Sequence, residues 1–185
     1  IHGVPGENGL LQGYLDMMGV PYGCCNVLAS ALTFDKHTCN TYLKSYGVNV
    51  ADSVMLIRGM AYDVNEIINE VGLPCFVKPN AEGSSFGVTK VKEAAQLEDA
   101  LKKAFALCRE VLIETFIDGT ELTCGVVKAG DMDITMPIAE VVPKNEFFDF
   151  EAKYDPTKSD EIIPARISPE PDQDIVFDDL RYIKM

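Results

Sequence analysis

CFVKPNAEGSSFG, residues 75–87, is the stretch that decides the fold of this chain. Residues 75–77 are apolar and follow a proline, which predicts a short buried strand. Lys78 ends that strand, and Pro79 stops its hydrogen-bond ladder. The loop that follows is rich in glycine and serine, and residues 88–91 resume an extended, β-branched pattern. A fixed cation beside a loop of free backbone N–H groups and hydroxyls is suited to hold a polyphosphate. An ordinary glycine turn is the alternative for this stretch taken alone, because the spacing is not that of a Walker A loop.

Length, charge and cysteine content limit the classes of partner. The 185 residues suit one medium domain or two small ones. The net charge of −13 and pI near 4.5 argue against nucleic acid or an anionic membrane as partner, whereas a small anion needs only a local positive pocket. No apolar run approaches the roughly 20 residues of a membrane span. The six cysteines lack metal-type spacing, so we expect buried free thiols and a cytoplasmic protein.

Helix and strand patterns alternate along the chain. Apolar spacing predicts helices that begin after Asn8, Asp35 and Asp63, each a residue type that caps helices, and a further helix over residues 94–108. Strands are expected over residues 52–57, 75–77, 110–115, and in a hairpin that joins 120–127 to 134–142. This order predicts an α+β fold with helices on one face of a mixed sheet. Residues 172–185 show little periodicity.

Four charged residues lie at the ends of predicted elements. Lys36 begins a helix, where the helix dipole disfavours a cation, and Lys78 and Glu114 end strands. Glu121 lies just inside another strand. Two cations suit the phosphates of a nucleotide, and two carboxylates suit its ribose hydroxyls or a base amino group. A surface charge or salt bridge is the alternative for each residue taken singly.

Several motifs resemble the signatures of the D-alanine–D-alanine ligases, a family of the ATP-grasp superfamily. They are HGVPGENGLLQG (2–13), SAL (30–32) with DK (35–36), VKP (77–79) with EGSS (82–85) and Gly87, LIE (112–114) with Gly119 and Glu121, and EAKY (151–154). The resemblance covers about residues 1–171, with the motifs in the family's order and spacing. No Ser-His-Asp order, Cys-His pair or HExxH motif occurs, so hydrolase-type nucleophilic catalysis has little support.

The resemblance implies a fold, a domain arrangement and an activity. Residues 1–29 would end an N-terminal domain, residues 30–115 would form the central ATP-grasp subdomain, and residues 116–185 would begin the C-terminal subdomain. In such ligases ATP phosphorylates the carboxylate of one D-alanine, and the amine of a second displaces phosphate from the acyl phosphate. The product, D-alanyl-D-alanine, serves peptidoglycan synthesis, and the implied cofactors are ATP and Mg²⁺.

The resemblance also implies which residues contact the nucleotide. Lys36 and Lys78 would contact the phosphates of ATP, while Glu114 and Glu121 would hold the adenine amino group and the ribose. The other implied contacts are the backbone of Phe116 and Ile117, the side chain of Phe147, and the loop residues Glu82, Ser84 and Ser85.

A second implied group serves the substrate and the chemistry. His2 and Glu7 would line the D-alanine site. Tyr154 would hydrogen-bond to Ser84, with Lys153 near the phosphate, so that Glu7, Ser84, Lys153 and Tyr154 form the implied catalytic set. Because relatives that make D-alanyl-D-lactate replace the EAKY segment, its presence predicts an amine acceptor.

The resemblance breaks at the C-terminal end. The family holds magnesium with Asp and Glu-x-Asn, and residues 172–185 carry no such motif, so the metal ligands are expected beyond this chain. The sequence therefore predicts an inactive fragment of a homodimeric ligase. Two alternatives stay open: another ATP-grasp carboxylate–amine ligase, and a non-catalytic nucleotide-binding module.

Overall fold

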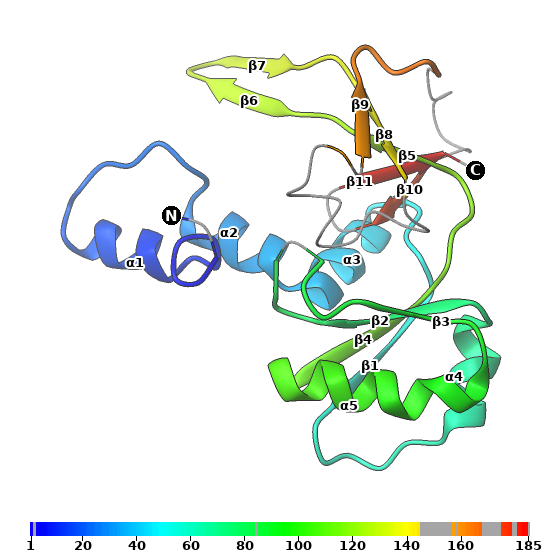
Figure 1. Ribbon diagram of the computed structural model, residues 1–185. Coiled ribbons are helices and arrows are strands. Elements are labelled where there is room, and N and C mark those ends of the chain that lie inside the picture. The colour runs from blue at the N-terminus through cyan, green and yellow to red at the C-terminus, as the bar shows by residue number, and fades with distance from the viewer. Residues whose placement is uncertain are drawn as a thin grey trace. The chain divides into compact units, whose positions relative to one another are not determined.

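The chain divides into two compact units, which are described separately. The computed structural model describes residues 1, 3–83, 85–144, 157, 159–167, 175–178 and 181–184, the last two ranges by their backbone. The first unit contains residues 1–46 and 52–115, and the second contains residues 47–51 and 116–185 (Figure 1). The assignment of residues 1–29 to a separate N-terminal domain stays a prediction.

A four-stranded sheet forms the centre of the first unit. Its strands are β1 (Ser53–Ile57), β2 (Cys75–Pro79), β3 (Thr89–Val91) and β4 (Glu110–Thr115). Their spatial order is β1-β4-β2-β3, and all neighbours are antiparallel. The predicted strands over 52–57, 75–77 and 110–115 are thereby confirmed. Because β4 lies between β1 and β2, the strand that carries Lys78 is adjacent to the strand that carries Glu114.

Two helices cover one face of this sheet and bury its apolar core. They are α4 (Val64–Val71) and α5 (Leu97–Leu107), the latter preceded by a short 3₁₀ turn, η1 (Ala94–Gln96) (Figure 1). Asp63 caps α4 as predicted, since its carboxylate accepts hydrogen bonds from the N–H groups of Asn65 and Glu66. The core between helices and sheet contains Leu56, Ile67, Val71, Cys75, Val77, Val91, Leu97, Ala100, Leu101, Ala104, Val111 and Ile113.

Three further helices belong to the first unit: α1 (Leu10–Met17), α2 (Val27–Phe34) and α3 (Lys36–Ser45). Asp35 caps α3 as predicted, and its Oδ1 accepts from Thr38 N at 2.8 Å. The prediction for Asn8 was wrong by one residue, because Gly9 is the N-cap of α1. Gly9 has φ of 86°, and a Cβ there would lie 2.8 Å from the carbonyl oxygen of Val27, so the turn requires glycine.

The second unit is built from antiparallel strands. They are β5 (Thr120–Thr123), β6 (Val126–Ala129), β7 (Met132–Thr135), β8 (Ala139–Pro143), β9 (Ser159–Ile162), β10 (Ile175–Asp178) and β11 (Arg181–Lys184). One sheet has the order β10-β11-β5-β8-β9, and β6 pairs with β7. The predicted hairpin is confirmed, because β5 pairs with β8 and β6 with β7. Strands β10 and β11 were not predicted, because their segment lacks a clear period of two.

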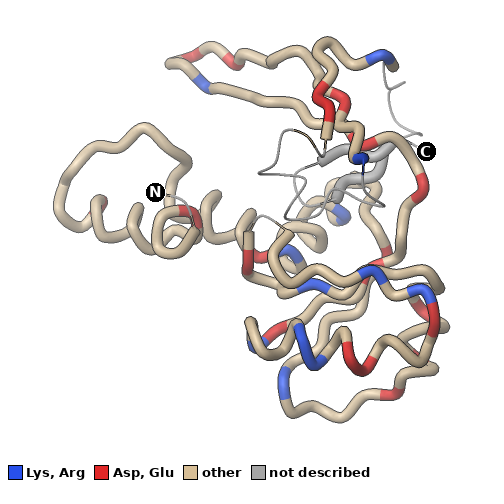
Figure 2. The backbone as a smooth tube through the Cα atoms, viewed as in Figure 1, with Lys and Arg blue, Asp and Glu red and all other residues tan. Residues whose placement is uncertain are grey.

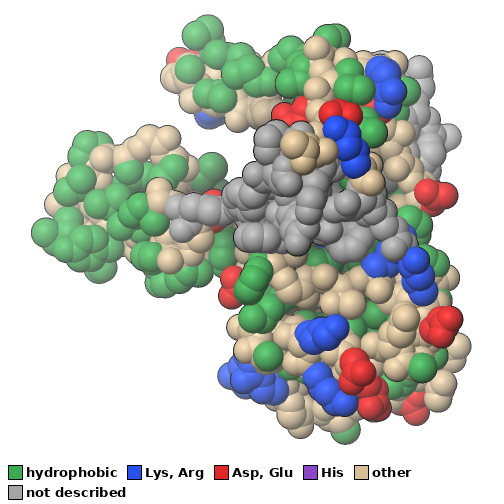
Figure 3. Space-filling model, viewed as in Figure 1, with side chains coloured by type: hydrophobic (Ala, Val, Ile, Leu, Met, Phe, Trp, Pro, Cys, Tyr) green, Lys and Arg blue, Asp and Glu red, His purple; other side chains and the backbone are tan. Residues whose placement is uncertain are grey.

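Positively and negatively charged residues are interspersed along the backbone of each unit (Figure 2). Apolar side chains gather on the surface over α1 and over the β6–β7 hairpin (Figure 3). Exposed members of these patches are Leu10, Tyr14, Met17 and Met18 on the first and Val126, Val127, Met132 and Ile134 on the second. Within the described ranges, none of the helices combines the length and the apolar character that a membrane crossing requires.

Candidate functional site

The face of the first unit's sheet opposite α4 and α5 carries a buried ion pair. Side chains alternate along a strand, so Val77 and Ile113 enter the core while Lys78 and Glu114 point to the other face. Lys78 lies opposite Leu112 in the ladder, which makes Glu114 its diagonal neighbour. The Lys78 ammonium pairs with Glu114 Oε2, and both side chains are at most 4% exposed. The two residues predicted to hold opposite ends of a nucleotide are thus in direct contact.

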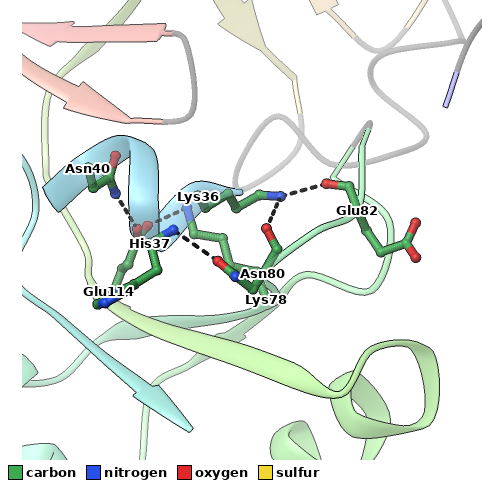
Figure 4. A network of polar contacts seen from close by, with 7 residues as sticks. All are labelled: Lys36, His37, Asn40, Lys78, Asn80, Glu82 and Glu114. Carbon is green, nitrogen blue, oxygen red and sulfur yellow. Dashed lines mark hydrogen bonds and ion pairs between the residues drawn. The ribbon is translucent and has the colours of Figure 1, made fainter. Parts of the chain in front are cut away.

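Helix α3 lies over this ion pair and supplies a third polar group. Asn40, in the middle of α3, donates from Nδ2 to Glu114 Oε1 at 2.9 Å (Figure 4). The two oxygens of Glu114 are therefore held by different partners, one by Lys78 and the other by Asn40. A hydrogen bond to a charged group in a buried setting contributes about 1.5–3 kcal/mol. The carboxylate is fixed in orientation before any ligand arrives.

Lys36 joins the start of α3 to the loop after β2. Its ammonium donates to the carbonyl oxygen of Glu82 at 2.5 Å and to that of Asn80 at 3.3 Å (Figure 4). Of the two lysines predicted to contact phosphates, Lys36 therefore contacts the glycine- and serine-rich loop, and Lys78 lies in β2, the strand that precedes this loop. Glu82 contributes its backbone carbonyl to this network.

The loop beyond Glu82 has the backbone of a tight, strained turn. Ser85 has φ of 56°, a left-handed conformation that non-glycine residues seldom adopt. Gly87 has φ of 75°, and a Cβ there would clash with the Leu107 side chain and approach Pro79 Cγ to 3.1 Å. The loop therefore needs glycine at this position to fold back against β2. Ser84 lies outside the described residues.

The N-terminal loop is closed on itself. Glu7 Oε2 accepts from Gly3 N at 2.6 Å, and Gln12, 2% exposed, donates from Nε2 to Gly6 O at 2.7 Å. These contacts fix the loop that holds the predicted D-alanine residue Glu7. His2, the other predicted D-alanine contact, lies outside the described residues.

The remaining predicted residues belong to the second unit. Phe116 and Ile117 follow β4 and are half-buried, and Glu121 lies in β5 opposite Val141. Lys153, Tyr154 and Phe147 lie outside the described residues.

The strands that precede and follow those three residues in the sequence pair with each other. Strands β8 and β9 pair up to Pro143 and Ser159, and Lys144 Nζ lies 2.9 Å from Asp160 Oδ1. Arg166 holds the carboxylate of Glu140 from both its backbone N–H and its guanidinium, and this hydrogen bonding lowers the pKa of Glu140.

The Cys75 thiol, in strand β2, is poorly suited to act as a nucleophile. The Cys75 thiol is fully buried, and desolvation raises its pKa to about 11, so it is not an active nucleophile. Within the described ranges, we find no cluster of three or more His, Cys, Asp or Glu side chains placed to bind a metal ion.

Sequence reasoning missed Asn40 and Asn80. A single asparagine has no periodic signature, and both act through partners distant in the chain. A signal was available for Asn40 alone, because it lies in the middle of a predicted helix, where asparagine is disfavoured unless its side chain has a specific role.

Comparisons with known proteins show which family this chain resembles. Residues 42–180 match a family model described as "D-ala D-ala ligase C-terminus". The chain is 57% identical over 167 residues to a D-alanine–D-alanine ligase from Phocaeicola vulgatus, covering 90% of this chain and 51% of that protein. It spans about half the length of the curated relatives that it matches.

Solved structures show the same likeness. The VanG D-Ala:D-Ser ligase from Enterococcus faecalis has a TM-score of 0.74 and 36% identity, over 90% of this chain and 49% of that one. A D-alanine–D-alanine ligase from Bacillus anthracis, solved in complex with ATP, has a TM-score of 0.72 and 30% identity, over 88% and 50%.

The sheet, its helices and these structural matches define an ATP-grasp fold. The chain belongs to the D-alanine–D-alanine ligase family.

Proposed function

We propose that this chain is the nucleotide-binding portion of an ATP-dependent, ADP-forming D-alanine–D-alanine ligase. The observation that carries the proposal is that α3 and β2 bring together the Lys78–Glu114 ion pair and the contacts of Lys36 with the loop after β2. This arrangement places two cations and a fixed carboxylate within one unit, which suits the phosphates and a polar end of ATP. The ATP complex of the Bacillus anthracis relative and the 57% identity to the Phocaeicola vulgatus ligase support the same assignment.

In the proposed reaction ATP transfers its γ-phosphoryl group to a carboxylate oxygen of the first D-alanine. This transfer releases ADP and leaves a D-alanyl phosphate. The amino nitrogen of the second D-alanine then bonds to the carbonyl carbon of the D-alanyl phosphate, phosphate leaves from that carbon, and the nitrogen loses a proton. Charge neutralisation and positioning are the main tasks of the protein in such a reaction. Lys36 and Lys78 would balance phosphate charge, and the strained loop at Ser85 and Gly87 would cover the phosphates.

The substrate side of the proposal rests on residues with fewer described contacts. Glu7 would contact the first D-alanine together with His2, and Ser84, Lys153 and Tyr154 would lie near the acyl phosphate. Glu121, Phe116, Ile117 and Phe147 would each contact the adenosine part of ATP, and Glu82 and Ser85 would contact ATP from the loop after β2.

The proposed cellular setting is the cytoplasm, with a homodimeric parent protein. The net charge of −13 disfavours nucleic acid and anionic membrane surfaces as partners. The six cysteines, all among the described residues, form no disulfide, which is typical of a reducing compartment.

ADP release in the presence of MgATP and D-alanine tests the proposal. The assay compares this 185-residue chain with the longest reading frame that contains it. D-alanine-dependent ADP release and dipeptide formation by the longer protein are expected, with little or none from the chain alone. D-serine, D-lactate and L-alanine serve as alternative acceptors, and D-serine is included because of the likeness to the VanG ligase. Absence of activity with every acceptor would overturn the proposed function.

A further inference from the structure

Asn80 is a fully buried side chain that connects three segments of the first unit. It follows β2 directly, between Lys78 and Glu82, and its exposed fraction is 0%. Its Nδ2 donates to Asp35 Oδ2 at 2.8 Å and to Glu110 Oε2 at 3.1 Å, and its Oδ1 accepts from His37 N at 2.9 Å. Because two carboxylates face the amide nitrogen and an N–H faces the oxygen, only one orientation of the amide satisfies all partners.

The backbone of Asn80 strengthens the same junction. Its N–H donates to Glu110 O at 2.9 Å, and its carbonyl accepts from Lys36 N at 3.2 Å and from Lys36 Nζ at 3.3 Å. A single residue at the end of β2 therefore holds both the start of α3 and the start of β4. Buried amides with this many partners act as rigid fixed points, since breaking one bond leaves a desolvated polar group behind.

These contacts exclude one mode of phosphate binding. The first N–H groups of a helix can bind an anion if they have no other partner. In α3, the N–H groups of Lys36 and His37 bond to Asn80, and those of Thr38 and Cys39 bond to Asp35. With those groups occupied, the cation that α3 offers to a phosphate is the side chain of Lys36.

We propose that Asn80 is a positioning residue of the ATP site, which sets Lys36 at the phosphate loop at a fixed distance from Lys78. This inference rests on the proposed function. A bound phosphate would compete with the Glu82 and Asn80 carbonyl oxygens for the N–H donors of the Lys36 ammonium. The side-chain bonds of Asn80 do not involve the ammonium, so they keep the backbone of Lys36 in place while its side chain turns.

The test uses the longest reading frame that contains this chain and two readouts, the ATP dissociation constant by calorimetry and the kinetics of ADP release. Asn80→Ala is expected to weaken ATP binding and to lower kcat/KM for ATP by about 10- to 100-fold, the range that a displaced catalytic group produces. The KM for D-alanine is expected to change by less than about twofold.

Two controls separate positioning from stability. Ile67→Val, in the core between α4 and the sheet, lowers stability without touching the network and should leave the ATP dissociation constant unchanged. The exchange variant D35N/N80D reverses the amide and the carboxylate at positions 35 and 80 and leaves Glu110 in place, so that the new carboxylate at position 80 faces one carboxylate instead of two. It is expected to bind ATP at least about threefold more tightly than Asn80→Asp alone, which faces two carboxylates. If Asn80→Ala does not fold, the comparison of D35N/N80D with Asn80→Asp tests the positioning role of Asn80 in its place.

The outcomes distinguish the two proposals. If Asn80→Ala binds ATP as tightly as Ile67→Val, or if D35N/N80D gives no recovery over Asn80→Asp, Asn80 has no positioning role. If the wild-type protein binds ATP but ligates no amino acid, the proposed function fails, and the dissociation constants alone decide the role of Asn80. Absence of ATP binding by the wild-type protein overturns both.

Discussion

Replacing Glu114 by glutamine tests whether the central ion pair is as buried as its exposure indicates. Glu114→Gln preserves the shape and an oxygen for Asn40, but it leaves the Lys78 ammonium, 4% exposed, without its opposite charge. Two unit charges about 4 Å apart interact by about 4 kcal/mol at an effective dielectric constant near 20. Removal of one partner from a buried pair typically costs about 3–5 kcal/mol. We expect Glu114→Gln to lower the unfolding free energy of the first unit by about 3–5 kcal/mol.

The double variant sharpens the test. K78M/E114Q removes both charges, so its cost should be smaller than the sum of the single costs, with a coupling of at least about 2 kcal/mol. Asp52→Asn is the matched control, because it removes the carboxylate of the Lys44–Asp52 pair, in which both side chains are at least 65% exposed. Such a surface pair contributes about 0–1 kcal/mol.

Hydrogen exchange of the β2 and β4 amides, measured as a function of urea, reports the unfolding free energy of the first unit alone. This choice avoids treating two units as one two-state transition. If Glu114→Gln costs no more than Asp52→Asn, within about 0.5 kcal/mol, the pair is solvated and the reasoning is refuted.

Three further predictions concern other parts of the chain. Gly87→Ala should cost more stability than Gly59→Ala in thermal unfolding, because both have positive φ but only Gly87 also lacks room for a Cβ; equal costs would contradict this. In a mass-spectrometric alkylation time course at pH 8, Cys75 should be modified far more slowly than the exposed cysteines, since burial raises its pKa to about 11; comparable rates would show that β2 opens readily. Arg166 lowers the pKa of Glu140 from its ordinary value of 4.5. The contribution of this ion pair to folding stability is therefore complete above pH 4.5 and is lost as the pH falls through the lowered pKa. Glu140→Gln should therefore flatten the acid side of a Tm–pH profile, and an unchanged profile would refute this.

Much of the first unit follows from local sequence signals. The capping residues Asp35 and Asp63, and the apolar runs of β2 and β4, predicted helix starts and strands that the structure contains. Such signals act within a few residues, so they can be read without knowledge of the fold. Strands β10 and β11 were missed, because pairing with a neighbouring strand rather than their own pattern stabilises them.

The candidate site also has some features that follow from the sequence and others that depend on the fold. The charged residues can be read from the sequence, and the period of two along β2 and β4 places Lys78 and Glu114 on the sheet face opposite the apolar core. The pairing of these two residues, and the contacts of Asn40 with Glu114 and of Asn80 with Asp35, depend on how the chain folds. The physical reason is that a buried charge or amide is stable only with partners, and those partners come from segments that chain folding, not sequence proximity, brings into contact.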